Sequence, residues 1–127
     1  MSDRRRVSSG SPYEPVIGFC RALAVGDRVL VAGTAPVWPD GSCPDDPAAQ
    51  TRRCLEIIVA ALKELGAAPR HVVRTRMFLT RAGDWEAVGR AHGEVFRDHT
   101  PVSTMVVVKE LLDPRWRVEI EAEAVID

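Results

Sequence analysis

A strictly alternating segment near the C-terminus constrains the fold of this chain more than any other feature. Its apolar positions are Trp116, Val118, Ile120, Ala122 and Ala124, and its charged positions are Arg117, Glu119, Glu121 and Glu123. A period of two places every second side chain on the same face of a β-strand. One face of the sheet must therefore be covered by apolar material, while the other meets water, a partner subunit or a ligand.

Four further strands are predicted from β-branched and aliphatic runs. Residues 22–32 form two short runs joined by Gly26-Asp27, a pair that favours a hairpin turn. Gly33 and Pro36 end the second run. Residues 71–80, "HVVRTRMFLT", and the tract that follows Pro101, "VSTMVVV", are also typical of strands.

Two amphipathic helices are predicted between these strands. The first follows the loop of residues 38–47: Asp46 is placed to cap it, Pro47 suits its first position, and Gly66 ends it. The second begins at Asp84, which we expect to act as its cap. The apolar stripe of the first is Leu55, Ile58, Leu62 and Leu65, and that of the second is Trp85, Val88, His92, Val95 and Phe96. The resulting order is ββαβαββ, in which two helices cover one face of a single sheet.

The length and composition indicate one globular domain. The chain has 127 residues, of which 46% are hydrophobic and 28% charged, and its net charge of −1 gives no reason to expect nucleic-acid binding. No apolar run approaches the ~20 residues of a membrane span, and no secretory signal follows the basic N-terminus. We expect a cytoplasmic protein with a flexible N-terminal segment over residues 1–15 and a single domain over residues 16–127.

The three cysteines give no sign of a metal site. Cys20, Cys43 and Cys54 are an odd number, form no CxxC pair and have no histidine at ligand spacing. We expect reduced thiols, and neither a metal nor an organic cofactor is implied.

Four segments together resemble the RidA family, also called YjgF or L-PSP, over residues 18–126. They are "GFCRALAVGDRVLVAGTAP", "DDPAAQTRRCLEIIVAALKELGA", "HVVRTRMFLT" and "RVEIEAEAV", in the same order and with the same spacing. The resemblance implies a chorismate-mutase-like, two-layer α+β fold with one mixed sheet. It also implies a homotrimer in which the sheets face inward and three clefts lie between subunits. In the best-known branch, those clefts hydrolyse enamine or imine forms of 2-amino acids to 2-keto acids and ammonia.

The resemblance also implies which residues line the cleft. Glu119, the first Glu of "VEIEA", matches the residue that orients water, and it is the catalytic candidate. Phe19 matches an aromatic residue that is commonly Tyr, Gly33 matches a glycine whose backbone lines the cleft, and Gly89 takes the place of a common Asn. Met105 matches a position that is often Cys and is expected to line the cleft.

The departure from the family lies in the stretch "PVST", where deaminating members carry a "PARS"-like tract. Ser103 stands where they have the arginine that holds the substrate carboxylate. The loss of such a charge-assisted contact costs about 2–5 kcal/mol in a partly desolvated site. Ser103 and Thr104 could contact a ligand or satisfy nearby backbone groups.

Arg76 and Arg117 are the candidate replacement cations, although strand arginines more often pair with acidic neighbours. His92 is expected to be packed and hydrogen-bonded within the fold.

Three functions remain open at this stage. The first is a trimer whose clefts bind a small carbonyl, enamine or imine metabolite and hydrolyse or deaminate it, without efficient turnover of 2-imino acids. The second is a non-catalytic, small-molecule-binding or regulatory trimer with the same clefts. The third is ribonuclease activity, which the near-neutral charge and the lack of an aromatic and basic stripe disfavour.

Overall fold

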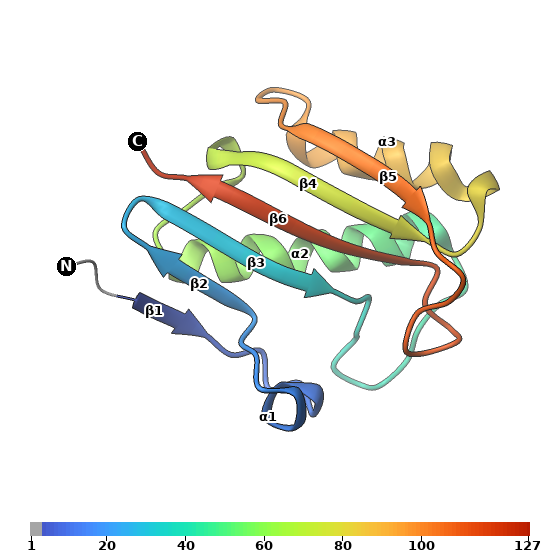
Figure 1. The fold of residues 1–127 in the computed structure, drawn as a ribbon. Coiled ribbons are helices and arrows are strands. Elements are labelled where there is room, and N and C mark those ends of the chain that lie inside the picture. The colour runs from blue at the N-terminus through green and yellow to red at the C-terminus, as the bar shows by residue number, and fades with distance from the viewer. Residues whose placement is uncertain (1–3) are drawn as a thin grey trace.

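The computed structural model describes residues 4–127, which form a mixed six-stranded sheet with helices on one face (Figure 1). The strands lie in the order β1-β2-β3-β6-β4-β5. All neighbours are antiparallel except β4 and β5, which run parallel. The strand bounds are β1 Arg4–Val7, β2 Ala22–Val25, β3 Arg28–Thr34, β4 Val72–Leu79, β5 Val102–Val107 and β6 Val118–Val125. The predicted α+β class and the mixed sheet are confirmed.

Two long helices lie against the same face of the sheet, α2 (Pro47–Glu64) and α3 (Trp85–Phe96). The core lies between them and the strands, and its largest fully buried apolar side chains are Leu55, Ile58, Leu62, Leu79, Ile120, Val29, Val88 and Val118. Asp46 caps α2 as predicted, because its side chain accepts a hydrogen bond from the Ala48 N–H at 3.1 Å. None of the helices within residues 4–127 is long and apolar enough to cross a membrane.

The alternation along β6 appears in its burial. Val118, Ile120, Ala122 and Ala124 are buried under the helices, whereas Glu119, Glu121 and Glu123 point to the opposite face and are half-buried. We call this opposite face, which no helix covers, the open face of the sheet (Figure 1).

The N-terminal segment differs from the flexible tail expected over residues 1–15, of which residues 1–3 lie outside the described part. Arg4–Val7 form the edge strand β1, and Tyr13–Ile17 form the short helix α1. Backbone hydrogen bonds to β2 hold β1 in place, and they need no particular side chains. Charged side chains are common on edge strands, where they discourage pairing with another chain.

A buried carboxylate organises the turn between β1 and α1. Glu14 is 6% exposed and accepts hydrogen bonds from the Ser8 hydroxyl at 2.8 Å and from the Ser9 N–H at 3.0 Å. Burial favours a raised pKa for Glu14, but the hydrogen bonds from Ser9 and Ser8 outweigh it and lower that pKa. The segment of residues 8–12 is therefore a structured loop held by the first turn of α1.

Candidate functional site

Gly33 and Glu119 lie together on the open face where β3 and β6 meet. The register between these strands is irregular from Val31 to Thr34, so Gly33 falls in a local distortion of β3. A Cβ on Gly33 would overlap the Glu119 Oε2 atom. Position 33 needs a glycine because the Glu119 carboxylate occupies the space that a side chain would fill.

Burial raises the pKa of Glu119, the neighbouring Arg21 guanidinium opposes that rise, and Glu121 adds to it. A carboxylate whose pKa is raised toward neutrality is a stronger base than an ordinary surface glutamate. Glu119 can therefore accept a proton from a bound water molecule.

Arg21 is a residue of this site that the sequence analysis did not identify. It is 6% exposed, and its Nη1 donates hydrogen bonds to the Gly33 carbonyl at 2.6 Å and to the Thr34 Oγ1 at 2.9 Å. The guanidinium also lies 5.5 Å from the centre of the Phe19 ring. The site residues fall into two groups. The first, which we call the Glu119 group, consists of Glu119, Gly33, Phe19 and Arg21.

Ser103 belongs to a second group on the helix side of the sheet. Thr75 of β4 is fully buried, and its Oγ1 lies 2.8 Å from the Ser103 Oγ and 2.8 Å from the His92 Nε2. The three side chains form one hydrogen-bonded chain across β5, β4 and α3. The His92 ring packs 4.6 Å from that of Phe96, which confirms a packed, hydrogen-bonded histidine. Burial lowers the pKa of His92, so the neutral imidazole is favoured.

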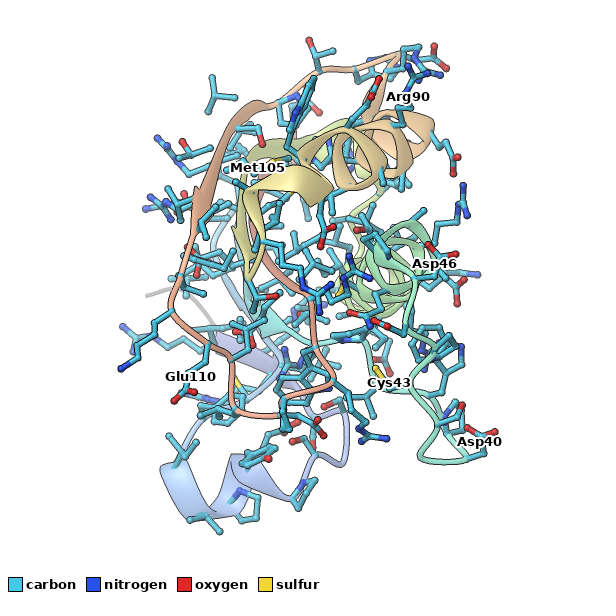
Figure 2. The ribbon with its side chains drawn as sticks, turned by 90° about the vertical axis from the view of Figure 1, so that its right-hand side faces the viewer. Asp40, Cys43, Asp46, Arg90, Met105 and Glu110 are labelled. Atoms are coloured by element: carbon cyan, nitrogen blue, oxygen red, sulfur yellow. The ribbon has the colours of Figure 1, made fainter. Side chains whose placement is uncertain are left out.

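Met105 and Gly89 lie near this chain, while Thr104 does not. Met105 pairs with Met77 in the parallel register and lies on the strand next to α3, the helix that carries Arg90 in Figure 2. Gly89 lies one turn before His92 on α3. Thr104 pairs with Arg76 and therefore points to the open face. The second group, which we call the Ser103 group, consists of Ser103, Thr75, His92, Met105 and Gly89.

The two groups lie on opposite faces of the sheet. Ser103 pairs with Thr75, which pairs with the buried Ala122, so all three point toward the helices. Glu119 alternates with buried residues and points to the open face, with β4 between it and β5. Within one copy of the chain, the two predicted site residues cannot contact the same small molecule.

Neither candidate replacement cation is free to take the place of the missing arginine. Arg76 donates to Glu121 at 2.8 Å and lies 3.8 Å from Glu123. Arg117 binds both oxygens of Asp84, at 3.0 and 2.7 Å, and lies 3.2 Å from Asp45. The expectation that these arginines pair with acidic neighbours is confirmed.

The partner of Arg117 corrects the prediction for the start of α3. Asp84 directly precedes this helix, but its side chain makes no capping hydrogen bond because both oxygens bind Arg117. The charge-assisted, two-point contact replaces the weaker cap.

The loop before α2 brings polar groups to the end of the molecule where Arg117 lies, since Asp45 of this loop pairs with Arg117. Figure 2 shows Asp40 at the outer end of this loop and Asp46 at the start of α2. Cys43 lies within hydrogen-bonding distance of the Arg115 carbonyl, and burial raises the pKa of its thiol. Within residues 4–127, no three His, Cys, Asp or Glu side chains are grouped closely enough to hold a metal ion.

The fold and the Glu119 group define a small α+β domain with a carboxylate on an uncovered sheet face. Comparison with known proteins identifies the family within this class. The model of the endoribonuclease L-PSP family matches residues 10–126. The chain belongs to this family, which is the YjgF/RidA family of the sequence analysis.

Three similar proteins illustrate this membership. The Streptomyces coelicolor protein SCO2049 is 46% identical, over 94% of this chain and 90% of its own. The 2-iminobutanoate/2-iminopropanoate deaminase of Escherichia coli is 30% identical, over 84% of this chain and 86% of its own. The crystal structure of Rv2704, a YjgF/YER057c/UK114 family member from Mycobacterium tuberculosis, superposes with a TM-score of 0.90 and 43% identity, covering 98% of this chain and 100% of that one.

Proposed function

We propose that this protein forms a homotrimer whose inter-subunit clefts bind and hydrolyse a small carbonyl, enamine or imine metabolite. The placement of Ser103 and Glu119 on opposite faces of the sheet carries this proposal. One copy cannot present both residues to one ligand, whereas the Glu119 group of one copy can meet the Ser103 group of the next. Assembly of the subunits would then be a requirement for a complete site.

The open face carries exposed apolar side chains beside its charged ones. Leu30, Val102 and Val106 point to this face and are 36%, 60% and 42% exposed in the single chain. Exposed apolar side chains that no helix covers favour burial against another subunit. Sheets that face inward in a trimer would cover them.

The proposed reaction uses the Glu119 carboxylate as a base. It would hold a water molecule, accept a proton as the oxygen attacks the C=N carbon, and return that proton to the nitrogen. The carbinolamine formed in this way would then pass its hydroxyl proton through Glu119 to the nitrogen, so that the C–N bond breaks as the C=O bond forms, and an imine and water give a carbonyl compound and ammonia. Ser103 of the neighbouring copy would hydrogen-bond a polar group of the ligand.

The charge of the cleft argues against efficient turnover of a 2-imino acid. Ser103 is neutral, and Arg76 and Arg117 are held by carboxylates. A carboxylate on the ligand would lack the two-point partner that an arginine at position 103 provides. The name of the Escherichia coli relative suggests the reaction class. Ser103, at the position where the family resemblance implies an arginine in deaminating members, favours another substrate within that class.

Ammonia release measures this proposal directly. Freshly generated 2-aminoacrylate and a set of uncharged imines would be supplied to the wild-type protein, to Glu119→Gln and to Ser103→Arg. We expect release from at least one uncharged imine that Glu119→Gln abolishes, and a gain on 2-aminoacrylate in Ser103→Arg.

Three outcomes would contradict parts of the proposal. Wild-type turnover of 2-aminoacrylate as fast as that of the Escherichia coli relative would show that the cleft needs no arginine at position 103. Binding of the imines without any turnover would support a non-catalytic binding protein instead. A stable monomer in light scattering would remove the basis for a shared cleft.

A further inference from the structure

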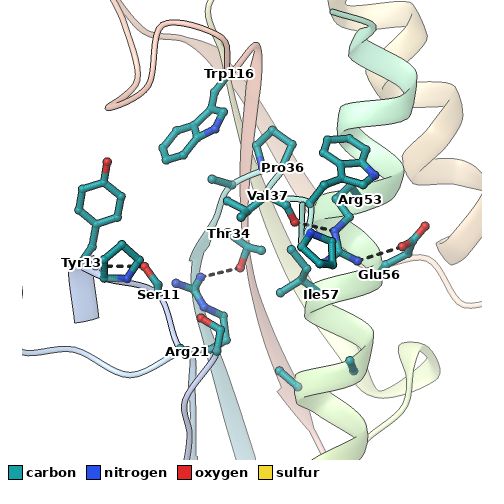
Figure 3. Close-up of a pocket in the computed structure, with 18 of the residues that line it drawn as sticks. Ser11, Tyr13, Arg21, Thr34, Pro36, Val37, Arg53, Glu56, Ile57 and Trp116 are labelled. Carbon is teal, nitrogen blue, oxygen red and sulfur yellow. Dashed lines mark hydrogen bonds and ion pairs between the residues drawn. The ribbon is translucent and has the colours of Figure 1, made fainter. Parts of the chain in front are cut away.

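A large cavity lies beside Arg21 of the Glu119 group, and none of its other lining residues belongs to that group or to the Ser103 group. It measures about 630 Å³ and is lined by the loop of residues 8–13, the segment of residues 34–39, one face of α2 and the tract around Trp116. Figure 3 shows Tyr13, Arg21 and Thr34 on one side of it and Arg53, Glu56 and Ile57 on the other. None of the residues that the sequence analysis placed in the cleft lines this cavity.

Arg21 is the buried charge of this cavity. It lies among the lining residues, yet no carboxylate lies within 4.0 Å of it in the part of the chain that the structure describes. Its three hydrogen bonds all leave from Nη1, and its Nε is buried without a partner among residues 4–127. The carboxylates of Glu14 and Glu119 balance the Arg21 charge only from beyond 4.0 Å, and burial still lowers the pKa of Arg21. An anion bound within hydrogen-bonding distance of the guanidinium would remove part of the cost of burying it.

The other two arginines that line the cavity, Arg53 and Arg115, already have partners. Arg53 binds the Val37 carbonyl at 2.7 Å and lies 3.3 Å from Glu56, and Arg115 binds Asp113 at two points. Glu56 and Glu64 line the cavity but are exposed. Arg21 is therefore the lining cation that retains donors for an incoming anion.

The walls of the cavity are suited to a flat apolar body. The rings of Tyr13 and Trp116 meet edge to face at 6.5 Å, and Val37 and Ile57 lie across from them in Figure 3. The volume falls within the range of small-molecule sites, which combine apolar walls with a few polar groups. Aromatic side chains favour an aromatic ligand because ring edges and faces attract one another.

We infer that this cavity binds a small aromatic carboxylate, with the Arg21 guanidinium holding the carboxylate and Tyr13 and Trp116 contacting the ring. The cavity does not include Glu119 or Ser103, although it shares Arg21 with the Glu119 group, and its lining residues all come from a single copy of the chain. It requires no chemistry at Glu119.

A pair of matched probes tests this site. Fluorine NMR would follow the binding of 4-(trifluoromethyl)benzoate and of 4-(trifluoromethyl)benzyl alcohol, which share a ring and differ in charge. We expect the benzoate to bind at least about tenfold more tightly, which is the effect of about 1.4 kcal/mol from one charge-assisted contact. Arg21→Met should reduce its affinity to that of the alcohol.

A second variant keeps the test independent of any change in folding at Arg21. Ala60 lines the cavity from an exposed position of α2, so Ala60→Trp would fill the space without touching Arg21. We expect it to abolish binding of both probes, while Ser103→Ala, in the other group, leaves the binding unchanged. Equal affinity for the two probes, or undiminished benzoate binding in Ala60→Trp, would overturn the inference.

Discussion

Gly33 lies so close to Glu119 that the glutamate Oε2 occupies the position of a Cβ on the glycine. We expect Gly33→Ala to push the carboxylate away from its place and to reduce imine hydrolysis at least tenfold, because a misplaced base loses its alignment with water. Steady-state kinetics of ammonia release would measure the loss. A variant with wild-type kcat would show that Glu119 does not need this position.

Gly89→Ala is the matched control for that substitution. A Cβ on Gly89 would meet no atom within 4 Å, and the residue lies inside α3. Alanine is favoured over glycine in a helix interior by about 1 kcal/mol, so we expect this variant to be more stable by about that amount. Urea unfolding of both glycine variants would compare them. A destabilised Gly89→Ala would mean that the space beside α3 is filled in the assembled protein.

Thr75 joins His92 to Ser103, and Thr75→Val should separate them. Valine has nearly the same shape but no hydroxyl, so His92 Nε2 and Ser103 Oγ each lose a partner. We expect about 1–2 kcal/mol of lost stability and weaker ligand binding, both recovered in Thr75→Ser. The nitrogen chemical shifts of His92 would report the lost bond directly. Unchanged shifts in Thr75→Val would exclude the hydrogen-bonded chain in solution.

The raised pKa of Glu119 gives its stability contribution a definite sign. Between the ordinary glutamate pKa of about 4.3 and the higher pKa of the folded state, the folded protein binds more protons than the unfolded one. The Glu119 contribution to the unfolding free energy is therefore present at low pH and decreases as pH rises through this window.

Glu119→Gln should remove this dependence. The stability of the variant relative to the wild type should increase with pH through the window and then level off. Chemical unfolding of both proteins at a series of pH values would measure the difference. A difference that falls with rising pH would mean that the pKa of Glu119 is lowered.

Gln50 is a buried polar residue of α2 that binds the backbone just before β6. It is 0% exposed, its Nε2 donates to the carbonyls of Pro44 and Arg115, and its Oε1 accepts from the Arg117 N–H at 2.7 Å. Gln50→Leu leaves these three backbone groups without partners, and we expect roughly 3 kcal/mol of lost stability. Arg52→Gln breaks only the exposed ion pair with Glu94 and should leave the melting temperature almost unchanged. Equal melting temperatures for the two variants would contradict this role of Gln50.

The sequence predicts the parts of this fold that are periodic or that carry a local stop signal. The alternation of β6, the Gly26-Asp27 turn and the Asp46 cap all lie where they are expected. Strand β1 was missed because three consecutive arginines have no period of two, and its place depends on backbone pairing with β2. Ser11 and Glu14 have the spacing of a capping box, but no such box forms, because the Glu14 carboxylate binds Ser8 and Ser9 instead.

The candidate site is harder to predict because its key contacts are tertiary. Arg21 stands alone between apolar residues, and nothing in that pattern tells whether its guanidinium reaches water or the Gly33 carbonyl. Asp84 has the position of a helix cap, but the arrival of Arg117 from 33 residues away decides where its carboxylate points. The separation of Ser103 and Glu119 follows from strand register, which a single sequence leaves open.

The position of Arg21 has a consequence for proton uptake. The same guanidinium that lines the cavity also opposes the rise in the pKa of Glu119. An anion that neutralises Arg21 would weaken this opposing effect, so that Glu119 would hold its proton more firmly. By thermodynamic linkage, a proton on Glu119 must then strengthen anion binding by the same factor. The cavity and the carboxylate would act as coupled sites, and the affinity for an anion would increase as the pH falls toward the pKa of Glu119.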